Sequence, residues 1–384
     1  MNASVVFEEL PTHARKKIAI ATLNRPKLLN GLSLEMCHLL TEQLRRWELD
    51  DSIALVVLRG EGGKAFCAGG DLHSLYRSVQ QNISGRPWDN VYAREFFAVE
   101  YRLDYSIHTY AKPVLCWASG IVMGGGVGLM LGASHRIVTE TTRFAMPEIK
   151  IGMFPDVGGS WMLERLPAGL GMFLALTGAQ LGAPDCRYLG LADYYLPSQA
   201  WPELLNALQS SSWTDAREEN DVRLHQILRG SRRDALGIGP MQRHHAFLGE
   251  QCDGPDFDAI CAAIASWQKH SDPFLAKAAE TFTRGSPGSA RLAFTLQRAA
   301  KGLSLASVFQ MEYTVALQCI GMGDFMEGVR ALLVDKDGKP RWQPQSIARA
   351  SADWARHMFE PSWPDTEAHP LADLREISNY KAAL

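Results

Sequence analysis

Three short runs of apolar and β-branched residues recur in the first third of the chain. They cover residues 18–23, 53–58 and 114–118, and turns with helical spacing lie between them. A continuous apolar run of this length is typical of a strand that is buried on both faces, as in a parallel sheet. Strands that alternate with helices predict an α/β fold with right-handed crossover connections.

Helical spacing separates these runs and then takes over the rest of the chain. Ser33 can cap a first helix. The apolar residues that share one stripe of that helix are Leu34, Cys37, Leu40, Leu44 and Trp47. A long helix is expected over about residues 90–110. Because helical periodicity dominates the later sequence, we predict a core over residues 1–200 and a mainly helical C-terminal region, residues 201–384, that packs on this core.

Two glycine-rich turns each follow an apolar run and precede a helical segment. Residues 124–126 are three consecutive glycines, and Gly69 and Gly70 stand directly before Asp71. The first N–H groups of a helix have no partner within it, and glycine allows a ligand to approach closely. Each turn alone fits a tight helix–strand packing equally well. The two together, followed by carboxylates, favour a site whose N–H groups converge on one oxygen.

Two carboxyl residues are candidates for chemistry. Glu148 lies in the apolar sequence F-A-M-P-E-I, and Asp156 lies in F-P-D-V-G-G. Burial would raise the pKa of Glu148 and make it usable as a base, acid or nucleophile near neutral pH. A strand-end glutamate that faces solvent explains Glu148 about as well, and Asp156 equally fits a helix N-cap. Glu100 falls on the predicted long helix, where exposure is the default for glutamate.

Composition narrows the class of protein. The chain has 384 residues, of which 46% are hydrophobic and 21% charged, and its formal net charge is −3. This is typical of a globular protein and gives no reason to expect nucleic acid or an anionic membrane as a partner. No apolar run is long enough to span a bilayer. The first residues show no targeting signal.

The cysteines and the short sequence motifs exclude further classes of protein. The seven cysteines are scattered and form no C-x-x-C pair, so we expect reduced thiols in a cytoplasmic protein. No histidine pattern has the spacing of metal ligands, and no complete phosphate-binding or dinucleotide-binding loop is present. The chain also lacks the G-x-S-x-G motif of serine hydrolases. Neither a metal nor a cofactor is expected.

The two glycine turns resemble those of a known family. The segments 66–71 (F-C-A-G-G-D) and 123–128 (M-G-G-G-V-G) are similar to the two oxyanion-hole motifs of the crotonase, or enoyl-coenzyme A hydratase/isomerase, superfamily. Further segments resemble its branch of 3-hydroxyisobutyryl-coenzyme A hydrolases; they are 22–30, 63–71, 144–148, 151–159 and 324–337. The resemblance runs from about residue 17 to about residue 345.

This resemblance implies a fold and a site. The fold would be a spiral of ββα units followed by helices. The thioester carbonyl of an acyl-coenzyme A substrate would lie between the N–H groups of Gly70 and Gly125. Glu148 would either attack the thioester or activate water, Asp156 would bind the β-hydroxyl of the substrate, and Glu100 would contact the substrate.

Two differences separate this chain from the hydratases of the family. Hydratases carry a first catalytic glutamate at the position of Gly128 and commonly have glycine at the position of Asp156. Both differences favour hydrolysis of a short 3-hydroxyacyl thioester, 3-hydroxyisobutyryl-coenzyme A, as in valine breakdown. Two alternatives stay open: an enoyl-coenzyme A hydratase or isomerase, and a non-catalytic acyl-coenzyme A-binding or scaffold protein. A homo-oligomer also stays open, because crotonase relatives often form trimers.

Overall fold

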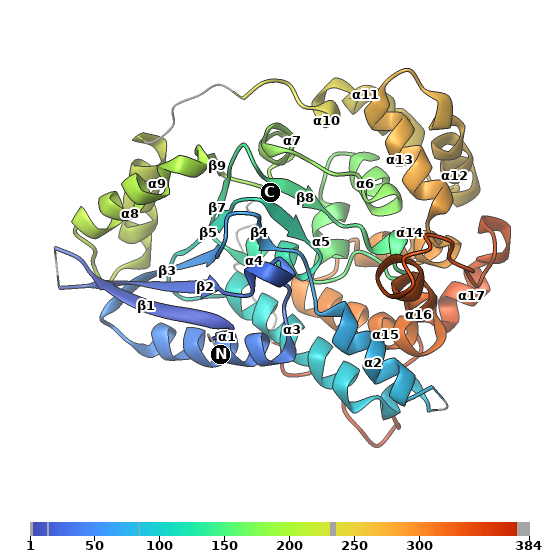
Figure 1. The fold of residues 1–384 in the computed structure, drawn as a ribbon, viewed down its shortest axis with the longest axis horizontal. Coiled ribbons are helices and arrows are strands. Elements are labelled where there is room, and N and C mark those ends of the chain that lie inside the picture. The colour runs from blue at the N-terminus through green and yellow to red at the C-terminus, as the bar shows by residue number, and fades with distance from the viewer. Residues whose placement is uncertain (1–2, 14, 84, 231–235, 375–384) are drawn as a thin grey trace.

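The structure is a computed structural model, and it describes residues 3–13, 15–83, 85–230 and 236–374. Strands and helices form one body in which sheets lie at the centre and helices surround them (Figure 1). Within the described residues, no helix combines the length and the apolar character needed to cross a membrane.

Two sheets form the centre of the fold. The larger sheet has the strand order β1 (Val5–Pro11), β2 (Lys17–Leu23), β3 (Ile53–Gly60), β5 (Val114–Ala118), β7 (His135–Val138) and β9 (Tyr194–Tyr195). The smaller sheet has the order β4 (Ala65–Cys67), β6 (Ile121–Met123) and β8 (Arg143–Ala145). Only the β1–β2 pair is antiparallel, and every other neighbouring pair is parallel.

Seven of the α-helices precede the last strand, β9, and the other ten follow it in the described chain. Those of the first part are α1 (Leu34–Leu49), α2 (Leu72–Gln81), α3 (Val91–His108), α4 (Gly125–Gly132), α5 (Gly159–Glu164), α6 (Leu170–Thr177) and α7 (Ala183–Tyr188). Those of the later part are α8 (Trp201–Ser210), α9 (Arg217–Gly230), α10 (Pro240–Arg243), α11 (His245–Cys252), α12 (Phe257–Ser266), α13 (Pro273–Arg284), α14 (Pro287–Ala300), α15 (Leu305–Met322), α16 (Phe325–Val329) and α17 (Ala352–His357).

A repeated order of strand, strand and helix generates the spiral. The repeats are β1–β2–α1, β3–β4–α2, β5–β6–α4 and β7–β8–α5. After the first repeat, the first strand of each joins the larger sheet and the second strand joins the smaller sheet. The predicted α/β spiral of ββα units followed by helices is therefore confirmed. The stretch between β3 and Asp71, which reads as a glycine-rich loop, contains the short strand β4.

Both faces of the larger sheet are buried, which explains its continuous apolar strands. In β2, Ala19 and Ala21 face the main core, whereas Ile18 and Ile20 belong to a second cluster on the opposite face. Successive side chains of a strand point to opposite faces, so each face needs its own cover. Helices α8 and α9 cover the second face, and Figure 1 shows them beside β2 and β3.

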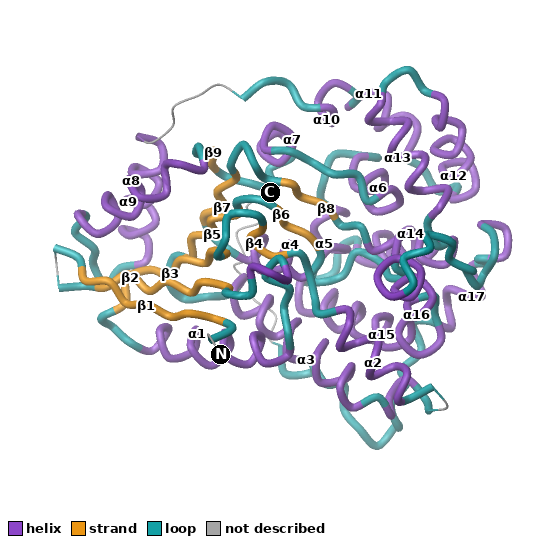
Figure 2. Tube along the Cα trace, in the orientation of Figure 1, coloured by secondary structure: helices purple, strands orange, loops and turns teal. Residues whose placement is uncertain are grey.

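The later helices pack against the first part rather than apart from it. Helix α15 packs on α3, and α14 packs on α5 and α6. Figure 2 shows these helices gathered beside the strands of the smaller sheet. The main hydrophobic core runs from Val5 to Leu371. The division of the chain at residue 200 stays a prediction.

The close approach of β4 and α4 generates a stability prediction. A Cβ atom on Gly126 would collide with the carbonyl oxygen of Cys67, which is backbone and cannot move aside alone. We expect Gly126→Ala to lower the free energy of unfolding by about 1–3 kcal/mol, as overpacking does, and to lower the melting temperature. Gly182→Ala is the control, because its Cβ would meet only Pro184 Cδ at 3.6 Å. Equal melting temperatures of the Gly126→Ala and Gly182→Ala variants would contradict the expected clash.

Candidate active site

Parallel pairing of β4 with β6 brings the two glycine turns together. Both turns leave the same edge of the smaller sheet, and a Cβ atom on Gly69 would lie 3.8 Å from the backbone nitrogen of Gly125. Gly69 and Gly124 have positive φ angles of 108° and 50°, which favour glycine. Among the described residues, the N–H groups of Gly70 and Gly125 have no hydrogen-bond acceptor. They are therefore available to a ligand oxygen.

Glu100 lies against both turns and is not an exposed helical residue. Its side chain, on α3, is only 2% exposed. A Cβ atom on Gly125 would collide with Glu100 Oε1, and one on Gly70 would lie 4.0 Å from it. This oxygen has no hydrogen-bond partner within the described part of the chain. Burial, and next the charge of Asp156, raise the pKa of Glu100 well above its usual range.

Glu148 begins a short 3-10 turn, η3 (Glu148–Lys150), that follows β8. Its side chain is 6% exposed, so the solvent-facing alternative is wrong. A Cβ atom on Gly124 would lie 3.3 Å from Glu148 Oε1. Glu148 Oε2 has no partner among the described residues. Burial, and next the charge of Asp156, raise the pKa of Glu148 well above its usual range.

A network of hydrogen bonds that includes Ser286 and Asp324 supports η3. The Ser286 hydroxyl donates to Asp324 Oδ2 at 2.7 Å, and the Ser286 N–H donates to the carbonyl oxygen of Ile149 at 2.9 Å. A Cβ atom on Gly328 would lie 2.5 Å from Ile151 Cα, so the segment that begins at Asp324 packs directly on this turn.

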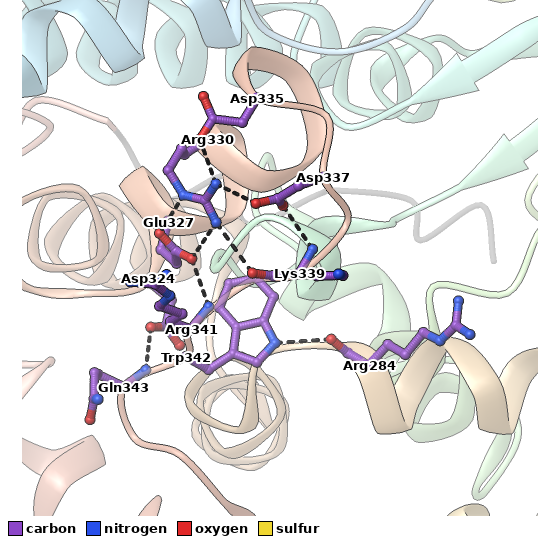
Figure 3. A network of polar contacts seen from close by, with 10 residues as sticks. All are labelled: Arg284, Asp324, Glu327, Arg330, Asp335, Asp337, Lys339, Arg341, Trp342 and Gln343. Atoms are coloured by element: carbon purple, nitrogen blue, oxygen red, sulfur yellow. Dashed lines mark hydrogen bonds and ion pairs between the residues drawn. The ribbon is translucent and has the colours of Figure 1, made fainter.

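Arg330 ties this segment together (Figure 3). Its guanidinium donates to both carboxylate oxygens of Glu327 at 2.8 Å, to Asp335 at 2.6 Å and to Asp337 at 2.8 Å. The Asp324 carboxylate also accepts the N–H of Gln343 at 2.6 Å. The 324–337 motif thus has a structural role, because it packs against the turn that carries Glu148.

Asp156 completes the group of candidate residues. The Tyr101 hydroxyl of α3 donates a hydrogen bond of 2.7 Å to Asp156 Oδ2. Burial raises the pKa of Asp156 from its ordinary 3.8 to about 6. The N-cap of α5 is Gly158, so the interpretation of Asp156 as a helix cap is wrong. Its carboxyl group is instead part of the buried site.

Sequence reasoning missed three residues of this region: Tyr101, Asp104 and Glu312. Asp104 is fully buried, and neither of its carboxyl oxygens has a partner in the described chain. A Cβ atom on Gly128 would lie 2.6 Å from Asp104 Oδ2, so this carboxyl group occupies the space of a side chain at position 128. The spacing of Glu100 and Asp104, four residues apart on one helix face, is the signal that was available.

The electrostatics of the site follow from burial of several carboxyl groups close together. Burial raises the pKa values of Glu100, Asp104, Glu148, Asp156 and Glu312. Within the described residues, no group of histidine, cysteine or acidic side chains has an arrangement that could hold a metal ion. Since like charges at short distance disfavour each other, each charged group in this cluster favours the neutral form of its neighbours. A carboxylate beside two free N–H donors is suited to attack at a carbonyl carbon.

Comparison with known proteins decides the family. The sequence profile described as "Enoyl-CoA hydratase/isomerase" matches residues 18–359. The chain belongs to the enoyl-CoA hydratase/isomerase family. Its resemblance to this superfamily, first suggested by the two glycine motifs, is thereby confirmed.

Individual members of the family carry different names. The chain is 37% identical to the mitochondrial 3-hydroxyisobutyryl-CoA hydrolase of Danio rerio over 93% of its own length and 89% of the relative. It is 33% identical to a carnitinyl-CoA dehydratase structure from Mycobacterium thermoresistibile, with a TM-score of 0.82 over 95% and 98% of the two chains. It is 35% identical to small ribosomal subunit protein mS47 of Neurospora crassa, over 87% and 69% of the two chains.

The raised pKa of Asp156 generates a prediction about stability and pH. Well below pH 3.8 the carboxyl group is neutral in both folded and unfolded chains. Above pH 6 it is charged in both, and the buried charge destabilises the folded state. One pKa unit corresponds to about 1.4 kcal/mol. We therefore expect Asp156→Asn to stabilise the protein by on the order of 3 kcal/mol at pH 8 and by less than about 1 kcal/mol at pH 4.

Thermal melting at both pH values measures this effect. Asp365→Asn is the control, because Asp365 is exposed and its carboxylate has no partner among the described residues. A stabilisation that is the same at both pH values would contradict the assignment to a buried charge.

Proposed function

We propose that this protein hydrolyses a short 3-hydroxyacyl-coenzyme A thioester, 3-hydroxyisobutyryl-coenzyme A, to the free acid and coenzyme A. The observation that carries the proposal is the position of Glu148, a buried carboxyl group with one unpartnered oxygen that lies against Gly124. The free N–H groups of Gly70 and Gly125 belong to the two turns that meet there. The 3-hydroxyisobutyryl-CoA hydrolase name of a relative that spans nearly the whole chain supports the same substrate.

The geometry suits a two-step hydrolysis. The thioester oxygen accepts hydrogen bonds from Gly70 and Gly125, while a Glu148 oxygen attacks the carbonyl carbon. The carbon–sulfur bond then breaks, coenzyme A leaves as its thiolate, and a mixed anhydride remains. Water cleaves this anhydride to the free acid and restores Glu148. Alternatively, Glu148 takes a proton from a water molecule that attacks the thioester directly; both routes place negative charge on the same oxygen.

The other carboxyl groups have supporting roles in this proposal. Asp156 accepts a hydrogen bond from the β-hydroxyl of the acyl group, and its bond from Tyr101 fixes its orientation. Glu100, whose Oε1 is unpartnered beside both glycine turns, contacts the substrate next to the oxyanion site. A substrate hydroxyl is a suitable donor because buried acceptors without partners are costly.

Two other functions remain as alternatives. A hydratase or dehydratase is favoured by the carnitinyl-CoA dehydratase title of a similar structure. Hydration usually employs two carboxylates, and the space at Gly128 is occupied by Asp104 instead of a side chain from position 128. A scaffold role is represented by the ribosomal relative. Buried carboxyl groups beside free donors oppose that role, because such groups cost stability without serving structure.

Compartment and assembly are part of the proposal. All seven cysteines are buried and free, as expected of reduced thiols. A cytoplasmic location stays our prediction, while several relatives are named as mitochondrial. A homo-oligomer likewise stays a prediction.

The deciding experiment compares two substrates. Release of free thiol from (S)-3-hydroxyisobutyryl-coenzyme A is measured in parallel with the absorbance of crotonyl-coenzyme A. We expect thiol release and no loss of crotonyl absorbance. Loss of crotonyl absorbance without thiol release would establish a hydratase, and binding of both thioesters without turnover would favour a scaffold.

Substitution of Glu148 tests its catalytic role. We expect Glu148→Gln to lower kcat for thiol release by about 100–10,000-fold or more, because the amide is neither a base nor a nucleophile. The affinity for the thioester should be retained, since the shape of the side chain is kept. Glu367→Gln, at an exposed position, is the control. Wild-type turnover by Glu148→Gln would remove Glu148 from the mechanism.

A further inference from the structure

We propose that Glu312 of α15 is a positioning residue that holds Asp156 at the substrate through the backbone of residues 157–160. The inference rests on the proposed function, in which Asp156 contacts the acyl group. It assigns a role in the reaction to a residue that lies more than 150 positions away in the chain, in the helical C-terminal region.

The contacts of Glu312 are made with backbone and not with a charged partner. The Gly158 N–H donates to Glu312 Oε2 at 2.7 Å, and the Ser160 N–H donates to Glu312 Oε1 at 2.9 Å. The side chain is fully buried. One carboxyl group therefore accepts hydrogen bonds from the two backbone N–H groups on either side of Gly159, in the turn that follows Asp156. Hydrogen bonds between a carboxylate and backbone N–H groups are stronger than neutral ones.

The backbone held in this way has an unusual conformation. Val157 has a φ angle of +51° and Gly158 one of +83°. A positive φ is rare for a β-branched residue such as valine, and it persists only where the surroundings impose it. The Gly159 N–H closes the turn by donating to the Asp156 carbonyl oxygen at 2.6 Å. Because the strained residue is next to Asp156, relaxation of this turn would rotate the Asp156 side chain.

Helix α15 also supports the partner of the Asp156 carboxyl group. The ring of Phe309, one turn before Glu312, lies 5.7 Å from the ring of Tyr101. A Cβ atom on Gly158 would lie 3.3 Å from Phe309 Cζ, so the same ring covers the turn. Helix α15 thus supports Asp156 in two ways. Glu312 binds the backbone that follows Asp156, and Phe309 packs against Tyr101, which donates the hydrogen bond to the Asp156 carboxyl group.

Packing alone does not account for a carboxyl group at this position. Burial of an acidic group without a cation is costly, and burial raises the pKa of Glu312 to about 8. The Asp156 carboxyl group is close enough to add to this effect. A residue that only filled space between α15 and α5 would not need a charge. Two backbone donors beside Asp156 do need two oxygen acceptors, which a carboxyl group supplies.

The test is a double-mutant cycle between Glu312 and Asp156. Thiol release is measured for wild type, Glu312→Ala, Asp156→Asn and the double variant, together with thermal melting. Glu312→Gln is measured as an isosteric variant. Its amide NH2 group is a donor, so it cannot accept the hydrogen bond of one of the two backbone N–H groups. Gln318→Ala is the control: it removes a buried hydrogen bond of 2.7 Å from α15 to the carbonyl oxygen of Glu360, away from the Asp156 turn.

We expect Glu312→Ala to lower kcat by about 10–100-fold, the effect of misplacing a catalytic group by about 1 Å. KM should change less than threefold, because the coenzyme A part of the substrate does not depend on this turn. Glu312→Gln should lower kcat in the same direction, and Gln318→Ala should leave it unchanged. The double variant should be no slower than Asp156→Asn alone, because Glu312 acts through Asp156.

Other outcomes would overturn the proposal. Activity of Glu312→Ala within threefold of wild type, or losses that multiply in the double variant, would make Glu312 merely structural. If Glu312→Ala does not fold, Glu312→Gln is compared with Asp156→Asn in the same cycle and decides the question. A wild-type protein that releases no thiol from the hydroxyacyl thioester would instead refute the proposed function. The cycle is then measured on crotonyl hydration, where additive losses again refute the coupling.

Discussion

Parallel pairing of β4 with β6 is the constraint on which the site depends. The two strands are only three residues long each, and each ends in a glycine turn. Because parallel strands end at the same edge, the N–H groups of Gly70 and Gly125 emerge side by side with no acceptor of their own among the described residues. A Cβ atom on Gly125 would collide with Glu100 Oε1, and one on Gly126 would collide with the backbone of Cys67.

The second feature is a group of acidic side chains that are buried close together, none of which forms an ion pair with another described residue. Desolvation disfavours the charged forms, and the groups disfavour one another's charge, so the pKa of each is raised. This arrangement costs folding stability. It also keeps Glu148 poorly solvated, which is the state in which a carboxylate is a strong base and nucleophile. Stability and reactivity are therefore set by the same burial.

The C-terminal helices contribute to the site as well as to the core. The segment after Asp324 supports the turn that carries Glu148, and α15 supports the turn that carries Asp156. Both supports contact backbone atoms. The turn after Asp156 has a conformation that its own residues do not favour, as the positive φ of Val157 shows. The spiral and the helices around it therefore both contribute to the candidate site.

The sequence by itself determined the α/β class, the two glycine turns and the candidates Glu148, Asp156 and Glu100. Local patterns indicate the class, the turns, Glu148 and Asp156: apolar runs of strand length, consecutive glycines, and acidic residues among apolar neighbours. Glu100 was a candidate only through the resemblance to the crotonase superfamily. The burial of Glu100, the partnership of Tyr101 with Asp156, the presence of Asp104 beside Gly128 and the contacts of Glu312 were decided only by the tertiary structure. These depend on which helix faces which turn, and that is fixed by packing between segments far apart in the chain. No local pattern records it.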